Sequence, residues 1–212
     1  MAAARRTRPR SRRGEGRLLR TEILVAATEL LDASGDARTV TLRAVARRVG
    51  IAAPSIYPHF PDRLAIVLAV VRQRFAELAD RIRSAVDTAG DDPHLRLVAA
   101  CRAYVDFAGS HPEQYRSMFG PGTAAEPTAL AAEAVQILRS ALTDCVAAGR
   151  STSADPGADA ISLWIGLHGL AHQRAVATSY PWPADIVHRI AEALSHLAGT
   201  RREPAPTTSE RS

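Results

Sequence analysis

Apolar residues recur along this chain at the three- and four-residue spacing that is typical of amphipathic helices. The first such face comprises Ile23, Ala27, Leu30 and Leu31, and Gly35 follows it directly. Glycine readily adopts the left-handed conformation that ends many helices. The pattern therefore predicts a helix that ends at Gly35.

Two short helices are expected next. The apolar face of the first is formed by Leu42, Val45, Ala46 and Val49. Thr41 stands where a side chain can cap this helix, and Gly50 stands where the helix should end. A second short helix is expected from about Ala52 to Tyr57. Two short helices joined through a glycine predict a helix-turn-helix, whose second helix would enter the major groove of DNA.

The remaining pattern is also helical. Pro61 and Asp62 are expected to start a long helix with proline at its first position and an acidic residue in its first turn. Apolar residues stripe this helix from Leu64 to Ile82. Further helices are expected over residues 93–109, 112–119, 128–148, 158–178 and 184–198. No segment alternates like a strand, so the predicted fold is all-α with about nine helices.

These elements divide the chain into five parts. We expect a disordered basic arm at 1–16, a helix-turn-helix domain at 17–63, a connecting long helix at 64–88, a ligand-binding and dimerisation domain at 89–199, and a disordered tail at 200–212.

The charge distribution separates the N-terminal part from the rest. All 27 basic residues are arginine, which is weak evidence of function because it also follows from a GC-rich coding bias. Residues 1–63 carry 13 arginines against 6 acidic residues, whereas the remainder carries 14 against 16. A basic end favours a polyanionic partner, although solubility and attraction to a membrane surface would explain it as well. The arm's arginines could follow phosphates, enter a minor groove, or form a solvated tail.

Other features limit the possible functions. Cys101 and Cys145 are too few for a disulfide framework or a zinc site and are expected to be buried thiols. The longest strongly apolar run, 64–71, is too short to cross a bilayer, so we expect a cytoplasmic protein. His168 and His172 are spaced for a shared metal ion, but no acidic partner completes a site, and we expect neither a metal nor a cofactor.

The segment TLRAVARRVGIAAPSIYPHFPDR, residues 41–63, resembles the tetracycline-repressor (TetR) family of bacterial regulators. The resemblance extends from Leu18 to about Leu78. It implies DNA contacts by Thr41, Arg43, Ala52, Ala53, Pro54, Ser55, Tyr57, His59 and Arg63. Ala52, Ala53 and Pro54 can only pack, for instance against thymine methyl groups, so direct base readout is expected from Arg43, Ser55 and Tyr57.

A second resemblance covers most of residues 90–198, on HPEQYRSMF at 111–119 and LWIGLHGL at 163–170. It is to the regulatory domain of the TetR subgroup with a Trp-His-Gly signature, here Trp164, His168 and Gly169. It implies an effector pocket and a four-helix dimer interface. The pocket candidates are Tyr104, Phe107, Tyr115, Met118, Phe119, Trp164 and His168, although side chains at helical spacing are more often plain core. The interface candidates are Leu163, Leu167, Leu170, Arg174, Ile186, Ile190, Leu194 and Leu197.

The leading hypothesis is a homodimeric, sequence-specific regulator of transcription, a repressor that an unidentified small-molecule effector releases from a pseudo-palindromic DNA operator. An all-α enzyme or small-molecule-binding protein is one alternative, against which stands the absence of a nucleophile elbow, a P-loop or paired carboxylates. A protein that coats DNA without sequence preference is the other. We therefore expect a DNA-binding protein that is not an enzyme.

Overall fold

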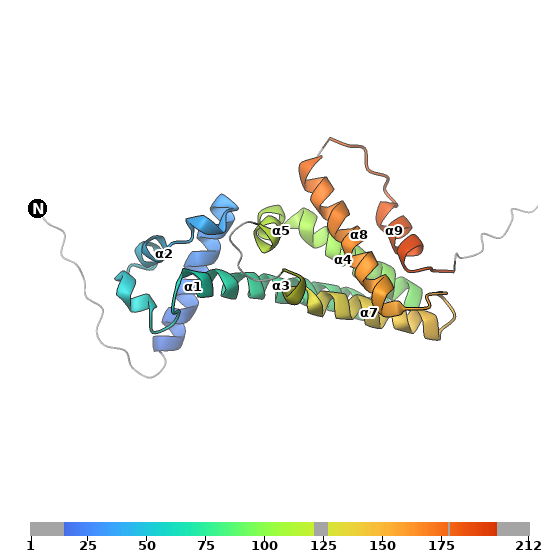
Figure 1. The fold of residues 1–212 in the computed structure, drawn as a ribbon, viewed down its shortest axis with the longest axis horizontal. Helices are drawn as coiled ribbons and strands as arrows, with labels where there is room; N and C mark the ends of the chain where they lie inside the picture. The colour runs from blue at the N-terminus through green and yellow to red at the C-terminus, as the bar shows by residue number, and fades with distance from the viewer. Residues whose placement is uncertain (1–14, 121–126, 178, 199–212) are drawn as a thin grey trace, which may run out of the picture. The chain divides into compact units, whose positions relative to one another are not determined.

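The computed structural model describes residues 15–120, 127–177 and 179–198, and within these ranges the chain is helical (Figure 1). In chain order the helices are α1 (Glu15–Ser34), η1 (Ala37–Thr39), α2 (Leu42–Val49), η2 (Ala53–Ile56), α3 (Arg63–Thr88), α4 (Pro93–Ser110), α5 (Pro112–Phe119), α6 (Pro127–Leu130), α7 (Ala132–Ala147), α8 (Pro156–Val176) and α9 (Ile186–Leu194). The predicted all-α fold is confirmed. The basic arm up to residue 14 and the tail from residue 199 lie outside the described residues.

Several predicted helix boundaries were wrong, and one of them belongs to the helix predicted over 184–198, which is α9 (Ile186–Leu194). The long helix α3 begins at Arg63, and Asp62 precedes it, where its Oδ1 accepts a hydrogen bond of 2.8 Å from the backbone N–H of Ala65. Asp62 therefore caps the helix from outside instead of lying in its first turn. The helix predicted over 128–148 is divided into α6 and α7.

The chain forms two compact units. The first contains residues up to Leu78 together with Ser110–Ala132. Its interior is built from buried side chains of α1, α2, η2 and α3, including Ile23, Val45, Ile56 and Val67. The helix-turn-helix of α2 and η2 is thus part of a larger core than these two short elements provide.

Helix α5 belongs to this first unit. A buried arginine explains the grouping, because Arg74 of α3 donates a hydrogen bond of 2.9 Å to Ser117 Oγ of α5 and forms an ion pair with Asp32 of α1. The rings of Phe75 and Phe119 add an edge-to-face contact with centroids 5.4 Å apart. Three helices therefore meet around one buried charge.

The second unit contains residues 79–109 and everything from Glu133 onward. Its helices α8 and α9 pack closely at Gly166, where an added Cβ would lie 2.7 Å from Leu194 Cδ1. An ion pair of 2.9 Å joins Arg150 to Asp92. Cys101 and Cys145 are buried, as predicted, and burial raises the pKa of their thiols to about 12 and about 11.

Candidate nucleic-acid interface

The first helix of the helix-turn-helix, α2, is closed at both ends by the residues that the sequence predicts. Thr41 Oγ1 accepts a hydrogen bond of 3.1 Å from the N–H of Ala44. Gly50 adopts the left-handed conformation, with φ of 77°. Val45 and Ala46 face the core, so the opposite side of α2 is directed to solvent.

The second helix is shorter than predicted. We expected a helix from about Ala52 to Tyr57, whereas η2 is a single 3-10 turn over Ala53–Ile56. Pro58 explains this, because it has no N–H to donate to the carbonyl of Pro54 and so cannot continue an α-helical ladder. Instead the N–H of Tyr57 lies 3.4 Å from the oxygen of Pro54, in the tighter 3-10 pattern.

Ile56 fixes this turn to the core and thereby exposes its neighbours. The Ile56 side chain is fully buried, whereas Ser55 is exposed and Tyr57 is 56% exposed. Pro54 is exposed too, and His59 is half-buried. Tyr57 and His59 are therefore both accessible, as a DNA-contacting role requires.

Arg20 of α1 holds the end of this turn. Its Nη1 donates a hydrogen bond of 2.6 Å to the carbonyl oxygen of His59, and its guanidinium carbon lies 4.1 Å from the ring centroid of Phe60. Phe60 is itself buried, at 2% exposure. The same arginine thus contacts both the backbone and an aromatic side chain immediately after residues 53–58. This segment, which consists of η2 and the two residues after it, is called the recognition turn below. A role for Arg20 could not be predicted from the sequence, since only the fold brings residues 20 and 59 together.

The arginines of the first unit fall into two groups. Arg48 forms an ion pair of 2.6 Å with Glu29, and Arg63 Nη1 donates a hydrogen bond of 2.9 Å to the carbonyl oxygen of Ala37. Arg63, which the resemblance places at DNA, thus also braces η1 against α3. Arg43 and Arg47 are exposed and have no hydrogen bond or ion pair with the part of the chain that the structure describes.

Arg47 is a candidate that the sequence analysis missed. It follows Arg43 by four residues on α2, so both guanidinium groups project from the same side of the helix. This four-residue spacing could have indicated from the sequence that Arg47 lies on the same face as Arg43. Two unpaired cations beside an exposed turn give this surface a local positive charge that suits phosphate and base edges.

The pocket candidates fall into two groups, one in each unit. Tyr115, Met118 and Phe119 belong to the first unit, where the Tyr115 and Phe119 rings lie 5.1 Å apart. Tyr104, Phe107, Trp164 and His168 belong to the second. The first two of these four are buried and the last two are half-buried.

Tyr104, Trp164 and His168 form one small cluster. Tyr104 Oη lies 3.5 Å from His168 Nδ1, and the Trp164 and His168 rings stack with centroids 5.8 Å apart. Burial, and to a lesser degree the nearby His172, lowers the pKa of His168. The described residues contain no group of three or more His, Cys, Asp and Glu side chains placed to hold a metal ion.

The three leucine candidates of α8 face the interior of their own chain. Leu163 and Leu167 are fully buried and Leu170 is 6% exposed, which leaves them almost no surface to offer to a second subunit. The large apolar side chains that α8 does expose are Ile161, Ile165 and Val176, at 50%, 57% and 71%. The remaining candidates, Arg174, Ile186, Ile190, Leu194 and Leu197, are half-buried.

None of the helices in the described ranges combines the length and the apolar character that a membrane span requires.

Comparison with known proteins gives the same assignment to both parts of the chain. Residues 23–70 match the family described as "Bacterial regulatory proteins, tetR family", and residues 97–197 match "Tetracyclin repressor-like, C-terminal domain". A curated relative, the HTH-type transcriptional activator FasR of Mycolicibacterium smegmatis, is 32% identical over 60% of this chain and 56% of its own. The chain thus spans only about half the length of the curated relatives it matches.

Solved structures share the fold over a larger part of the chain. A protein of unknown function from Rhodococcus sp. RHA1 is 27% identical, with a TM-score of 0.72 over 85% of this chain and 96% of its own. A bacterial regulatory protein of the tetR family from Rhodococcus RHA1 is 19% identical and shows the fold alone, with a TM-score of 0.62 over 85% and 98% of the two chains. The capped helix, the exposed turn and these matches lead to one assignment. The chain belongs to the TetR family of bacterial regulatory proteins.

Proposed function

We propose that this protein is a transcriptional regulator that binds a specific DNA operator through α2 and η2. The observation that carries the proposal is the position of two arginines beside an exposed turn. Arg43 and Arg47 form no hydrogen bond or ion pair within the described residues. The turn is held in place by the buried Ile56 and by Arg20. Side chains held on a rigid support lose little conformational freedom on binding, which favours selective recognition. Family membership supports the same proposal.

Each exposed group has a role that its chemistry suits. Arg43 is assigned to a guanine edge, where a guanidinium pairs with O6 and N7, and Arg47 to a neighbouring phosphate. Ser55 and the Tyr57 hydroxyl are assigned to base or phosphate oxygens. Ala52, Ala53 and Pro54 offer apolar contact to thymine methyl groups.

The deciding experiment is a titration of the full chain against its own promoter region and against random duplex, each at two salt concentrations. A specific regulator is expected to prefer its own region by ~10³-fold or more. A DNA-coating protein would show equal affinities that fall together with salt. A protein of another class, such as an enzyme or a carrier, would bind neither duplex, and either result would overturn the proposal.

We propose a homodimer whose interface uses the exposed face of α8 defined by Ile161, Ile165 and Val176. Exposed apolar side chains on one helix face are costly in water and are covered when a second copy packs against them. A twofold dimer would present two η2 turns to two half-sites about one helical turn of DNA apart, which implies a pseudo-palindromic operator.

We propose that an effector releases the protein from its operator and that the bound protein represses transcription. An effector shifts the equilibrium only if it binds the released state more tightly than the bound one. The relative FasR is named an activator, so whether this protein represses or activates transcription needs its own test. A reporter under the chain's own promoter is expected to rise when the gene is deleted, and a fall would instead assign activation.

A further inference from the structure

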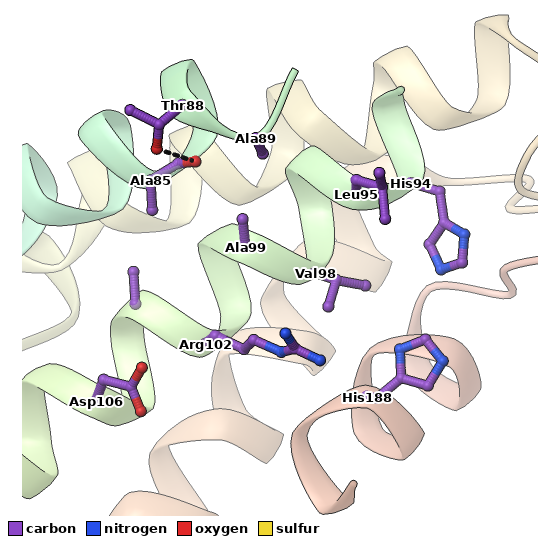
Figure 2. A pocket seen from close by; sticks show the side chains of 11 residues that line it. Ala85, Thr88, Ala89, His94, Leu95, Val98, Ala99, Arg102, Asp106 and His188 are labelled. Carbon is purple, nitrogen blue, oxygen red and sulfur yellow. Dashed lines mark hydrogen bonds between the residues drawn. The ribbon is translucent and has the colours of Figure 1, made fainter. Parts of the chain in front are cut away.

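A cleft of about 430 Å³ opens within the second unit, between the last turns of α3, the outer side of α4, and α9 (Figure 2). Its floor is formed by small apolar side chains, among them Ala85, Ala89 and Ala99. Such side chains leave room above the backbone, and the volume is in the range of small-molecule sites. None of the pocket candidates from the sequence lines this cleft.

One end of the cleft carries a buried imidazole with one nitrogen that has no hydrogen-bond partner among the described residues. His94 is 7% exposed, and its Nε2 has no hydrogen-bond partner among the described residues. Leaving a buried polar nitrogen unsatisfied is unfavourable, so such an atom is a site where a bound ligand can contribute a hydrogen bond. The ring stacks on His188 of α9, with centroids 5.8 Å apart, and His188 Nε2 lies 3.1 Å from Glu192 Oε1.

A free cation points toward this end. Arg102 lines the cleft from α4, and Figure 2 shows its guanidinium extending toward His188. Arg102 is exposed and forms no ion pair with the part of the chain described here, including with Asp106 one turn along α4. Asp106 lies at the other end of the cleft (Figure 2). A guanidinium with all its donors available matches the planar acceptor geometry of a carboxylate.

We propose that this cleft binds a small organic acid. The carboxylate would accept hydrogen bonds from Arg102 and from the His94 imidazole, while the apolar body would cover the alanine floor beside Val98 and Leu95. The floor distinguishes this ligand from a simple inorganic anion, which would leave the apolar surface wet. A regulatory role of this site rests on the proposed function, because α3 also carries the residues that follow the recognition turn. Binding of the acid does not depend on the proposed function.

The test uses the full chain and cyclohexanecarboxylate as the probe, followed by calorimetry and by NMR of the histidine ring carbons. Saturable binding is expected, with shifted signals of His94 and His188. Arg102→Gln should weaken binding at least about tenfold, since a charge-assisted contact is lost. Arg139→Gln, which removes an exposed arginine of α7 outside the cleft, should change it less than about twofold.

A second comparison needs no variant. In the unaltered chain, cyclohexanecarboxamide has the same body without the charge and should bind at least about tenfold more weakly. Equal binding of acid and amide, an Arg102→Gln variant that binds as well as the unaltered chain, or no saturable binding would each overturn the proposal. Displacement of the acid by an equal concentration of inorganic phosphate would overturn its organic specificity.

Operator affinity is measured in the same preparation without the probe. If the acid binds but the promoter is not preferred over random duplex, the proposed function fails and the cleft remains a ligand site. If the promoter is preferred and the acid does not bind, only the cleft assignment fails.

Discussion

Arg43 and Arg47 lie one turn apart on α2, and neither guanidinium has a hydrogen bond or ion pair within the described residues, so the proposed contribution of each to DNA binding can be measured separately. Other arginines of the first unit already have internal roles, as Arg20, Arg48 and Arg63 show. At the residue scale, then, partners within the chain separate arginines that support the fold from arginines available to a ligand. Composition alone could not separate them.

Arg43→Ala is expected to weaken operator binding by ~1–3 kcal/mol, because one bidentate contact to a base is lost. Discrimination at that base pair should also decrease. The measurement is a set of dissociation constants for the operator and for single-base variants of it. Retention of both affinity and selectivity would remove Arg43 from the interface, and Arg139→Ala serves as the matched control.

Arg20→Met tests whether the support of η2 matters for binding. The variant loses the hydrogen bond to the carbonyl oxygen of His59 and the contact over Phe60, and we expect operator affinity to fall by about 1 kcal/mol at this exposed position. Arg17→Met removes a similarly exposed arginine of the same helix as the control. Equal effects of the two substitutions would assign Arg20 a general electrostatic role instead.

At the scale of elements, the residues that cap or end helices were the most useful for predicting where helices begin and end. Gly35, Thr41 and Gly50 end or cap helices where the sequence placed them, since glycine conformation and capping depend only on nearby residues. The 3-10 turn was not predicted. Pro54 and Pro58 have no backbone N–H, and the length of the turn depends on which of the other backbone hydrogen bonds can still form. Nor was the burial of Leu163 and Leu167, because α8 has apolar residues on two sides and periodicity cannot say which one meets the chain's own core.

Gly50→Ala should destabilise the fold by ~1–2 kcal/mol, the cost of a left-handed conformation for a residue with a Cβ. No atom lies within 4 Å of the added methyl group, so a steric clash does not contribute. The free energy of unfolding in urea measures this. Gly50→Asn should cost less, since asparagine tolerates the conformation better, and the reverse order would refute the backbone explanation.

Asp32→Ala tests the charge cluster that joins α1, α3 and α5. It leaves the nearly buried Arg74 guanidinium without its carboxylate, and the expected loss is about 2–4 kcal/mol of unfolding free energy, reduced because Asp32 is partly exposed. Adding Arg74→Met should recover part of that loss by removing the unpaired charge. If the double variant Asp32→Ala, Arg74→Met unfolds more easily than Asp32→Ala alone, removing the unpaired charge has brought no gain. The ion pair would then not be the interaction that stabilises this cluster.

For the molecule as a whole, α8 carries the proposed subunit contact. Ile165→Glu should convert a dimer to a monomer in sedimentation equilibrium, because a charge would be buried opposite a second copy. Leu95→Glu alters a similarly exposed side chain of α4 and should leave the mass unchanged. A dimer that survives Ile165→Glu would move the interface elsewhere.

Helix assignments could be predicted from the sequence, whereas the two units and the cleft could not. Ser110–Ala132 joins the first unit through contacts between residues more than forty positions apart, such as Arg74 with Ser117. Four alanines line the cleft and carry no chemical signal in the sequence, and its two histidines lie on different helices. Only their arrangement in space gives them a role.

The two prolines of the recognition turn restrict how this protein could acquire a new target. Substituting Pro54 or Pro58 would change the shape of the turn as well as its chemistry. The exposed positions of α2 and the turn after it that are proposed to face DNA, and that can vary without altering these prolines, are therefore few, namely 43, 47, 52, 55 and 57. A combinatorial library confined to these five sites is expected to sample much of the range of operator sequences that this scaffold could distinguish.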